Sequence, residues 1–321
     1  MTENIRYRKY SVYLREKYGQ KVYKIPINIP VTCPNRDGVL GRGGCIFCGD
    51  IGAGFENLSN SLSVKEQLHK NINYISSKYK AKKFIAYFQN FTNTYLPIDK
   101  FKDFIREAAD FEDVVEIYIS TRPDCISDEY LQVLDEIQKI YQKEITLELG
   151  LQTVNYKTLK KINRGHTLAE FIDAMMNINK YQFGSCCHII LNLPWDDFED
   201  VIEASKIISV LGVKQVKIHS LYILRNTVLG NMYENNEFQI ITVEEYVDRV
   251  VNFIRYLSPD IVIQRLVARA PKEETLFCNW NMSWWKVQDM IDERLEKLDI
   301  YQGDRYDYVG GKALRRFKNF L

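Results

Sequence analysis

Short apolar segments alternate with longer segments of helical periodicity along most of this sequence. The expected strands lie at 22–29, 84–88, 114–120, 145–150, 185–193, 213–221 and 260–266. The expected helices lie between them, at 63–79, 99–111, 127–141, 168–181, 198–212 and 242–257. Strands that alternate with helices of this length form βαβ units and a parallel sheet. The pattern predicts an α/β fold, a partial parallel (β/α)6 TIM-like barrel, whose chemistry lies at the C-terminal strand ends.

The sequence offers no linker, so we expect one catalytic domain over residues 1–321, with its core at about 20–270. Ser63 and Glu66 form a capping box ahead of the first expected crossover helix. The stretch from about 275 to 321 contains a helical pattern at 280–298. We expect this C-terminal extension to pack on the barrel.

Composition narrows the class of protein. The chain carries a formal net charge of +1, which argues against a general nucleic-acid surface, although basic clusters occur at 78–83 and 312–318. No apolar stretch is long enough to span a membrane, and the N-terminal segment does not have the pattern of a secretory signal. The seven cysteines are an odd number. These features predict a cytoplasmic location.

Three of the cysteines, Cys33, Cys45 and Cys48, follow the first expected strand with the spacing C-x11-C-x2-C. The intervening loop is rich in glycine and polar residues, whereas core cysteines usually lie on apolar elements. A structural zinc site needs four ligands, and the nearest further candidate, His69, lies inside an expected helix. An iron–sulfur cluster takes cysteine thiolates, and three of them would leave one iron open. We favour the cluster over chance clustering and over zinc.

Further stretches strengthen this interpretation. They are YFQNFTNTYLP from Tyr87, STRPDCI from Ser120, LELGLQT from Leu147, RGHT from Arg164 and KIHSLYIL from Lys217. With the cysteine loop, they resemble the radical S-adenosylmethionine (SAM) superfamily over roughly residues 5–275, and within it the YhcC-like subgroup related to the elongator catalytic subunit. The resemblance implies a [4Fe-4S] cluster whose open iron binds SAM and whose electron cleaves it to a 5′-deoxyadenosyl radical.

The resemblance also implies residues that bind the cofactor. Phe47 would shield the cluster and touch the adenine, and Gln152 would bind the ribose hydroxyls. Arg164 would pair with the SAM carboxylate, for which a planar guanidinium is suited. Ser120 and His188 would be polar SAM contacts, although a turn cap and a buried core histidine are their ordinary alternatives. Two further residues occupy the place of the family's glycine-rich turn, Gln89 and Asn90.

Several polar residues are candidates for the substrate. Glu148 is a carboxylate in an apolar strand, and a buried carboxylate is costly unless paired, so we expect a bond to substrate or to Arg122 or His188. Arg122, Asp124 and His219 lie at expected strand ends.

A departure from the subgroup lies at LNLPWDD, residues 191–197, where LGLPGE is usual. Asn192 and Trp195 replace glycines and Asp196 replaces the glutamate. These three residues are predicted to contact substrate, with Trp195 stacking on a flat heterocycle; the alternative is that Trp195 packs outward on the following helix.

The resemblance leaves the reaction open. The favoured hypothesis is a lyase that releases queuine from queuosine or queuosine 5′-phosphate, with flavodoxin or ferredoxin as the reductant. A tRNA-modifying enzyme is the alternative, and a cluster-bearing electron carrier is a third. The catalytic residues themselves are not identified.

The ligand assignment predicts the outcome of single cysteine substitutions. Cys33→Ala, Cys45→Ala and Cys48→Ala should each abolish the brown chromophore after anaerobic reconstitution, because a cubane needs its thiolates. Matched substitutions at the other four cysteines, which lie outside the motif, should retain it: Cys125, Cys186, Cys187 and Cys278. Iron content and visible absorbance measure both sets. Full iron content in any of the first three variants would refute the assignment.

Overall fold

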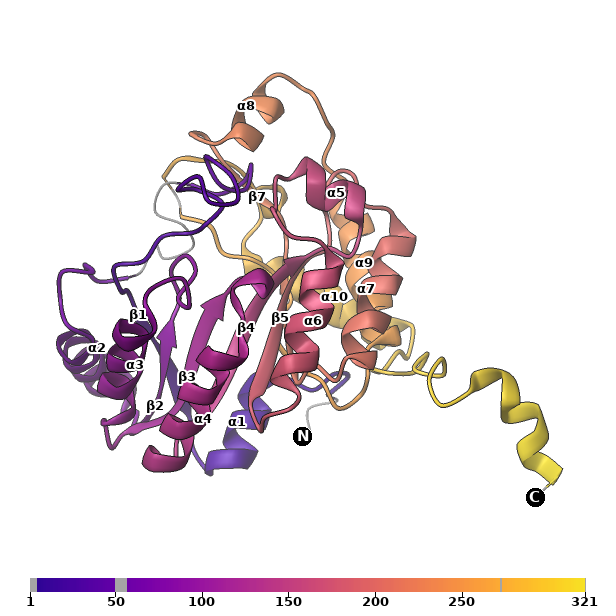
Figure 1. Cartoon of the computed structure of the whole chain (residues 1–321). Coiled ribbons are helices and arrows are strands. Elements are labelled where there is room, and N and C mark those ends of the chain that lie inside the picture. Colours follow the sequence, from indigo (N-terminus) through magenta and orange to yellow (C-terminus); the bar gives the residue numbers. More distant parts are fainter. Residues whose placement is uncertain (1–4, 50–56, 272, 321) are drawn as a thin grey trace.

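The computed structural model describes residues 5–49, 57–271 and 273–320, and its main feature is a parallel sheet that curls into a half-barrel (Figure 1). Its seven strands are β1 (Val22–Ile27), β2 (Lys83–Phe88), β3 (Val114–Thr121), β4 (Glu144–Gln152), β5 (Gly184–Ile190), β6 (Gln215–His219) and β8 (Val262–Arg265). They lie side by side in this order, and every neighbouring pair is parallel. The expected fold class is confirmed, and each expected strand has a counterpart. The sheet has one strand more than a six-stranded barrel.

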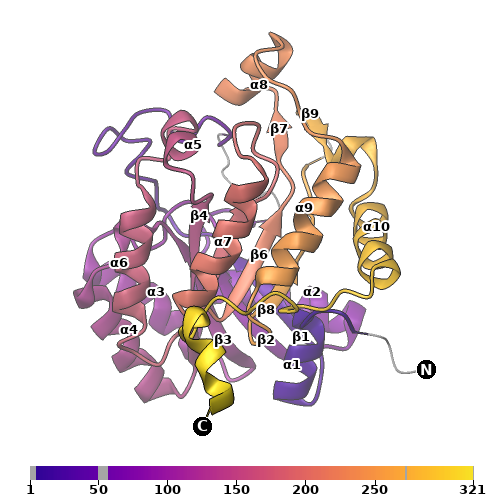
Figure 2. The same ribbon diagram turned by 90° about the vertical axis from the view of Figure 1, so that its right-hand side faces the viewer.

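Helices cover the outer, convex face of the sheet (Figures 1 and 2). They are α2 (Val64–Tyr79), α3 (Ile98–Ala109), α4 (Asp128–Tyr141), α6 (Leu168–Ile178), α7 (Phe198–Val210) and α9 (Val243–Tyr256). Ser63 and Glu66 form the expected capping box at the start of α2. The expected C-terminal helix is α10 (Trp284–Lys297), which packs against α9. No helix in the described part of the chain has both the length and the hydropathy of a membrane span.

Several short elements were not predicted from the sequence. They are α1 (Tyr10–Tyr18), α5 (Tyr156–Lys161), α8 (Val228–Glu234), the antiparallel pair β7 (Tyr222–Leu224) and β9 (Thr275–Cys278), and the 3-10 turns Pro123–Cys125, Asn279–Asn281 and Lys312–Phe320. Most are too short for a periodic pattern, and α1 buries only Leu14. The last of them extends away from the half-barrel at the C-terminus (Figure 1).

Side chains along each strand alternate between the outer face of the sheet, which packs on the helices, and its inner face. On β4, Leu147, Leu149 and Leu151 are fully buried in the main hydrophobic core. Successive side chains of a strand point to opposite faces, so Glu148 and Gly150 face the inside of the half-barrel. The outer face therefore supplies the packing against the helices, and the inner face carries the polar residues.

Helix α1 closes the end of the half-barrel opposite the cysteine loop (Figure 1). Leu14 packs with Ile85, Tyr87 and Tyr118 in a separate buried cluster. The segment before α1 joins the edge of the sheet, where the Ile263 N–H donates to the Arg8 carbonyl at 2.9 Å. The N-terminal segment thus forms the floor beneath the inner face.

The packing of α1 against the sheet predicts that loss of its buried leucine destabilises the protein. Leu14→Ala removes a side chain that is 4% exposed, and it should lower the free energy of unfolding by about 2–4 kcal/mol, as cavity-forming substitutions do. Glu16→Ala, on the exposed side of the same helix, is the matched control. Denaturant unfolding followed by circular dichroism measures both. Equal losses in the two variants would show that α1 does not seal the floor.

Candidate functional site

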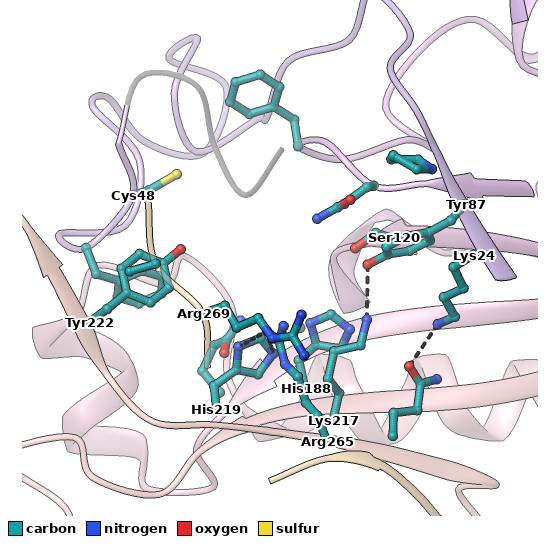
Figure 3. A pocket seen from close by; sticks show the side chains of 18 of the residues that line it. Lys24, Cys48, Tyr87, Ser120, His188, Lys217, His219, Tyr222, Arg265 and Arg269 are labelled. Atoms are coloured by element: carbon teal, nitrogen blue, oxygen red, sulfur yellow. Dashed lines mark hydrogen bonds between the residues drawn. The ribbon is translucent and has the colours of Figure 1, made fainter. Parts of the chain in front are cut away.

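A cavity of about 920 Å³ runs from the cysteine loop down the inner face of the half-barrel. All three motif cysteines line it, and so do residues from each of the seven strands. In Figure 3, Cys48 lies at one end of the cavity and Lys24 and Lys217 lie at the other. The cavity therefore joins the predicted cluster site to the polar interior of the sheet.

Each motif cysteine has an arginine beside its sulfur. The contacts are Cys33 with Arg122 Nη1 at 4.0 Å, Cys45 with Arg164 Nη1 at 3.4 Å and Cys48 with Arg36 Nη1 at 3.4 Å. Positive side chains next to a cysteine favour its thiolate, which is the form that binds iron. Three soft thiolate donors, each held by a separate guanidinium, fit a cubane cluster with three protein ligands.

The pKa of Cys48 shows what opposes its thiolate form. Burial raises the pKa of its thiol, and the Cys45 thiol raises it further, whereas Arg36 opposes the shift. Arg36 thus offsets only part of the cost of ionising Cys48, and a bound metal would supply further positive charge. The neighbouring Cys125 does not line the cavity, and burial first, and Asp124 second, raise its thiol pKa to about 12.

Hydrogen bonds fix the cysteine loop to the segment that follows α5. The Asn35 amide donates to the Asn163 carbonyl at 2.6 Å, and the Asn163 amide donates to the Gly44 carbonyl at 2.8 Å. Gly44 has φ +82°, and a Cβ there would lie 3.1 Å from Arg36 Cγ. Glycine at this position thus allows both the left-handed turn and the approach of Arg36 to Cys48.

The predicted cofactor residues are mostly brought together. Six line the cavity: Phe47, Gln89, Ser120, Gln152, Arg164 and His188. Asn90 does not; it is 5% exposed and lies 3.4 Å from the Asn28 side-chain oxygen. Contacts with SAM stay predictions for all seven.

Arg164 has a role that the sequence did not indicate. Its Nε and Nη2 donate to the Gly150 carbonyl at 3.2 and 2.6 Å, and its Nη1 approaches Cys45. A guanidinium has five N–H donors, so three are used within the chain and two remain for a carboxylate. The side chain is thus positioned by β4 and held against the cluster site before any ligand enters.

Glu148 lies at the centre of the inner face, fully buried. Lys24 and Lys217 each donate to it at 2.6 Å, and His188 Nε2 lies 2.8 Å away. Burial alone would raise the pKa of Glu148, but Lys217 and Lys24 hold it well below its usual range. Burial and Lys217 lower the pKa of His188 to about 4, so the imidazole is neutral near pH 7. Of the two expected partners of Glu148, His188 is confirmed.

Arg122, the alternative partner, pairs with Asp124 instead. Its Nε and Nη2 make a bidentate pair with Asp124 at 2.8 and 2.6 Å, while its Nη1 faces Cys33. Because Asp124 occupies two of its nitrogens, Arg122 is held at the cysteine end of the cavity and not beside Glu148.

Ligand atoms of Glu148, Cys186 and His188 lie within 4.8 Å of one another. The Glu148 carboxylate is already bonded by two ammonium groups. Burial and then Glu148 raise the pKa of the Cys186 thiol beyond its usual range. A divalent cation would meet two like charges and a neutral thiol, so this group is an ion-pair network and not a second metal site.

Asn192, Trp195 and Asp196 are not among the side chains that line the cavity. The Asn192 oxygen accepts from the Leu221 N–H at 2.6 Å. Trp195 packs edge-on against Phe238, with ring centroids 5.6 Å apart, and Lys161 Nζ lies 4.7 Å from its ring centroid. Their substrate contacts stay predictions that this placement does not support.

Sequence reasoning missed several cavity residues. The most important are Lys24, Arg36, Lys217, Arg265 and Arg269. Lys24 and Lys217 are charged residues in apolar strands, which is the same signal that identified Glu148. Applied to both charge signs, that rule would have found the network.

Comparisons with known proteins agree with this geometry. A family model described as "Radical SAM superfamily" matches residues 27–208, and one described as "Radical_SAM C-terminal domain" matches residues 213–297. YtqA of Bacillus subtilis is 33% identical over 93% of this chain and 92% of its own length. YhcC of Escherichia coli is 31% identical over 89% of this chain and 91% of its own length.

Solved structures share the fold at low sequence identity. Elp3 of Methanocaldococcus infernus superposes with a TM-score of 0.67 at 16% identity, over 88% of this chain and 64% of that chain. This chain therefore spans just under two thirds of that Elp3 chain. Methylornithine synthase (PylB) superposes with a TM-score of 0.53 at 12% identity, over 96% of this chain and 88% of that chain.

Asp196 provides a test of its structural role. It is 8% exposed, and burial raises its pKa from 3.8 to about 6, although Thr153 and Thr158 oppose the shift. The folded state thus binds a proton that the unfolded state releases between about pH 4 and 6, and this stabilisation is lost as pH rises through that window.

Asp196→Asn removes the titrating group. Relative to the parent protein, the variant should gain up to about 3 kcal/mol of unfolding free energy between pH 4 and pH 7. Urea unfolding across this range measures the difference, and Asp103→Asn on the exposed face of α3 controls for net charge. A difference that does not change with pH would contradict the assignment.

Proposed function

The chain belongs to the radical SAM superfamily, and from this premise we propose that its cavity binds a small nucleoside-like substrate next to the cofactors. Enzymes of this superfamily use a [4Fe-4S] cluster and SAM. When bound, the cluster supplies the electron that cleaves SAM to the 5′-deoxyadenosyl radical. Cys33, Cys45 and Cys48 would hold it at the mouth of the cavity.

The observation that carries the proposal is the continuity of the cavity from the cysteines to the inner face of the sheet. At about 920 Å³ it is near the upper end of the range for small-molecule sites, roughly 300–1,000 Å³. A cofactor at the cysteine end would leave the Lys217 and His219 end for a second molecule. The size of this space is that of a site for a small substrate.

Side chains along the wall have separate tasks in this proposal. Gln152 and Ser120 lie at adjoining strand ends on the SAM side and offer polar contacts to the cofactor. Gln264 and His219 also line the cavity, where Gln264 accepts from Lys24 and His219 lies against Arg265. Burial and Arg265 lower the pKa of His219 well below the usual value, so its imidazole is neutral and adds no positive charge there.

For the reaction, we propose that the enzyme is a lyase that releases queuine from queuosine or queuosine 5′-phosphate, with flavodoxin or ferredoxin as the electron donor. Support comes from the motif set of the chain and from the cavity that joins the cysteines to the inner face of the sheet. Hydrogen bonding to the edge of an extruded or free base is a general mode of base recognition. An enzyme that modifies intact tRNA would need a surface that admits a folded RNA to this cavity.

The proposal predicts a specific product. Anaerobically reconstituted protein, given SAM, dithionite and queuosine 5′-phosphate, should form queuine and 5′-deoxyadenosine, both detected by mass spectrometry. The Cys45→Ala variant should form neither, because its cluster is not held. Omitting the nucleotide controls for SAM cleavage without substrate.

Three results separate the parts of this proposal. Cleavage of SAM without queuine release would refute the substrate while leaving the superfamily chemistry intact. Modification of queuosine-containing tRNA, with the free nucleotide unchanged, would assign the enzyme to RNA. Absence of SAM cleavage by a protein with full iron content would contradict the cofactor geometry.

A further inference from the structure

Arg265 ends β8 and directs its guanidinium into the deep part of the cavity (Figure 3). Its Nη2 lies 2.5 and 3.1 Å from the two ring nitrogens of His219. Its Nε is buried and has no hydrogen-bond partner among the described residues. Arg265 is partly buried, and no carboxylate of the described residues forms an ion pair with it, although Glu148 lies near enough to act on its charge. A guanidinium stays charged at every relevant pH, so this side chain is a cation without a directly bonded counterion.

The histidine beside Arg265 does not offset the charge. Burial lowers the pKa of His219 well below its usual value, and Arg265 and His188 lower it further, so the ring is neutral and accepts from Arg265. Uncompensated charge in a low-dielectric site is costly, and proteins normally pair it. An arginine without a partner on a cavity wall therefore points to a ligand that brings the missing negative charge.

The side chains near Arg265 add more positive than negative charge. Lys24 and Lys217 share the single carboxylate of Glu148. Arg269, close enough to Arg265 to lower its pKa, stacks on Trp284 at 4.0 Å from the ring centroid. Lys24, Lys217 and Arg265 thus have one carboxylate between them among the described residues, an excess of two positive charges. Arg269 is exposed, so water screens the further positive charge that it adds.

The cofactor does not supply the missing charge. SAM carries one carboxylate and one positive sulfonium group, and its amino group is neutral when it binds iron, so it adds no net negative charge to the cavity. The cysteine end has its own arginines, Arg36, Arg122 and Arg164, which face the sulfurs. The excess at the Arg265 end is therefore left for the second molecule.

We propose that Arg265, with Lys217 and Arg269, forms an oxyanion subsite that binds the phosphate of a phosphomonoester substrate. A phosphate dianion matches the excess charge better than a carboxylate does, and a guanidinium fork binds it in bidentate fashion. The inference rests on the proposed function, since it names a group of that substrate. It selects a nucleotide over the corresponding neutral nucleoside.

The test is anaerobic titration calorimetry of cluster-reconstituted protein that is saturated with SAM and held without reductant. Inorganic phosphate is the probe, and acetate is the comparison for a carboxylate. The parent protein should bind phosphate more tightly than acetate. Arg265→Gln should weaken phosphate binding roughly tenfold or more, as expected for loss of a charged hydrogen-bond donor. Arg106→Gln, an exposed arginine on α3, is the matched control and should bind as the parent does.

Two further variants distinguish a loss of phosphate binding from a folding defect. Arg265→Lys keeps the charge without the fork and should fall between the parent and Arg265→Gln. Arg269→Gln alters an exposed side chain, so folding is not at risk, and it should still weaken phosphate binding severalfold. Cluster absorbance and circular dichroism establish that each variant is intact.

The outcomes are distinct. No phosphate binding by the parent, or equal binding by Arg265→Gln and Arg106→Gln, overturns the subsite. Acetate that binds as tightly as phosphate overturns the phosphomonoester assignment. Phosphate binding that depends on Arg265, combined with no turnover of queuosine 5′-phosphate, supports the subsite and refutes only the substrate named above.

Discussion

The contact between each cysteine of the motif and its own arginine is the interaction on which the functional site depends. The loop that carries the cysteines has no helix or strand, and its shape comes from hydrogen bonds within it together with side chains from outside it. Arg122 follows β3 and Arg164 follows α5, and both reach the cysteine loop from elements distant in sequence. The half-barrel brings these segments to one edge, where a guanidinium lies beside each sulfur. The fold thus places positive charge around three sulfurs that would be thiolates in an iron–sulfur centre.

The inner face of the sheet carries buried charges that are only partly paired. Parallel sheets are normally apolar on both sides, but this one carries a buried carboxylate, Glu148, between two lysines. Each of these charges would be costly alone, and together they still leave a positive excess that extends to Arg265. A structural ion-pair network would be expected to balance its charges. The imbalance is best explained by a ligand, and it links the architecture of the half-barrel to the charge of the proposed substrate.

Most of the strands and helices, and part of the site, could be predicted from the sequence. The strands were found because a buried parallel strand is a short apolar run, and the helices because their period is long enough to count. Helix α1 was missed because it buries a single leucine, and β7 because three residues carry no pattern. At the site, the spacing of the cysteines and the anomalous Glu148 were visible, whereas the partner of Arg122 was not. That arginine pairs with a carboxylate two residues away, and a local pair of this kind competes with any long-range one.

The central question is whether the three cysteines hold a cluster with an iron that SAM can reach. Electron paramagnetic resonance of the anaerobically reconstituted, dithionite-reduced protein, recorded with and without SAM, tests this most directly. We expect the signal of a reduced [4Fe-4S] cluster in both samples, with its shape changed by SAM because the cofactor binds the open iron. A cluster signal that SAM leaves unchanged, or no cluster signal from protein with intact Cys33, Cys45 and Cys48, would contradict the account.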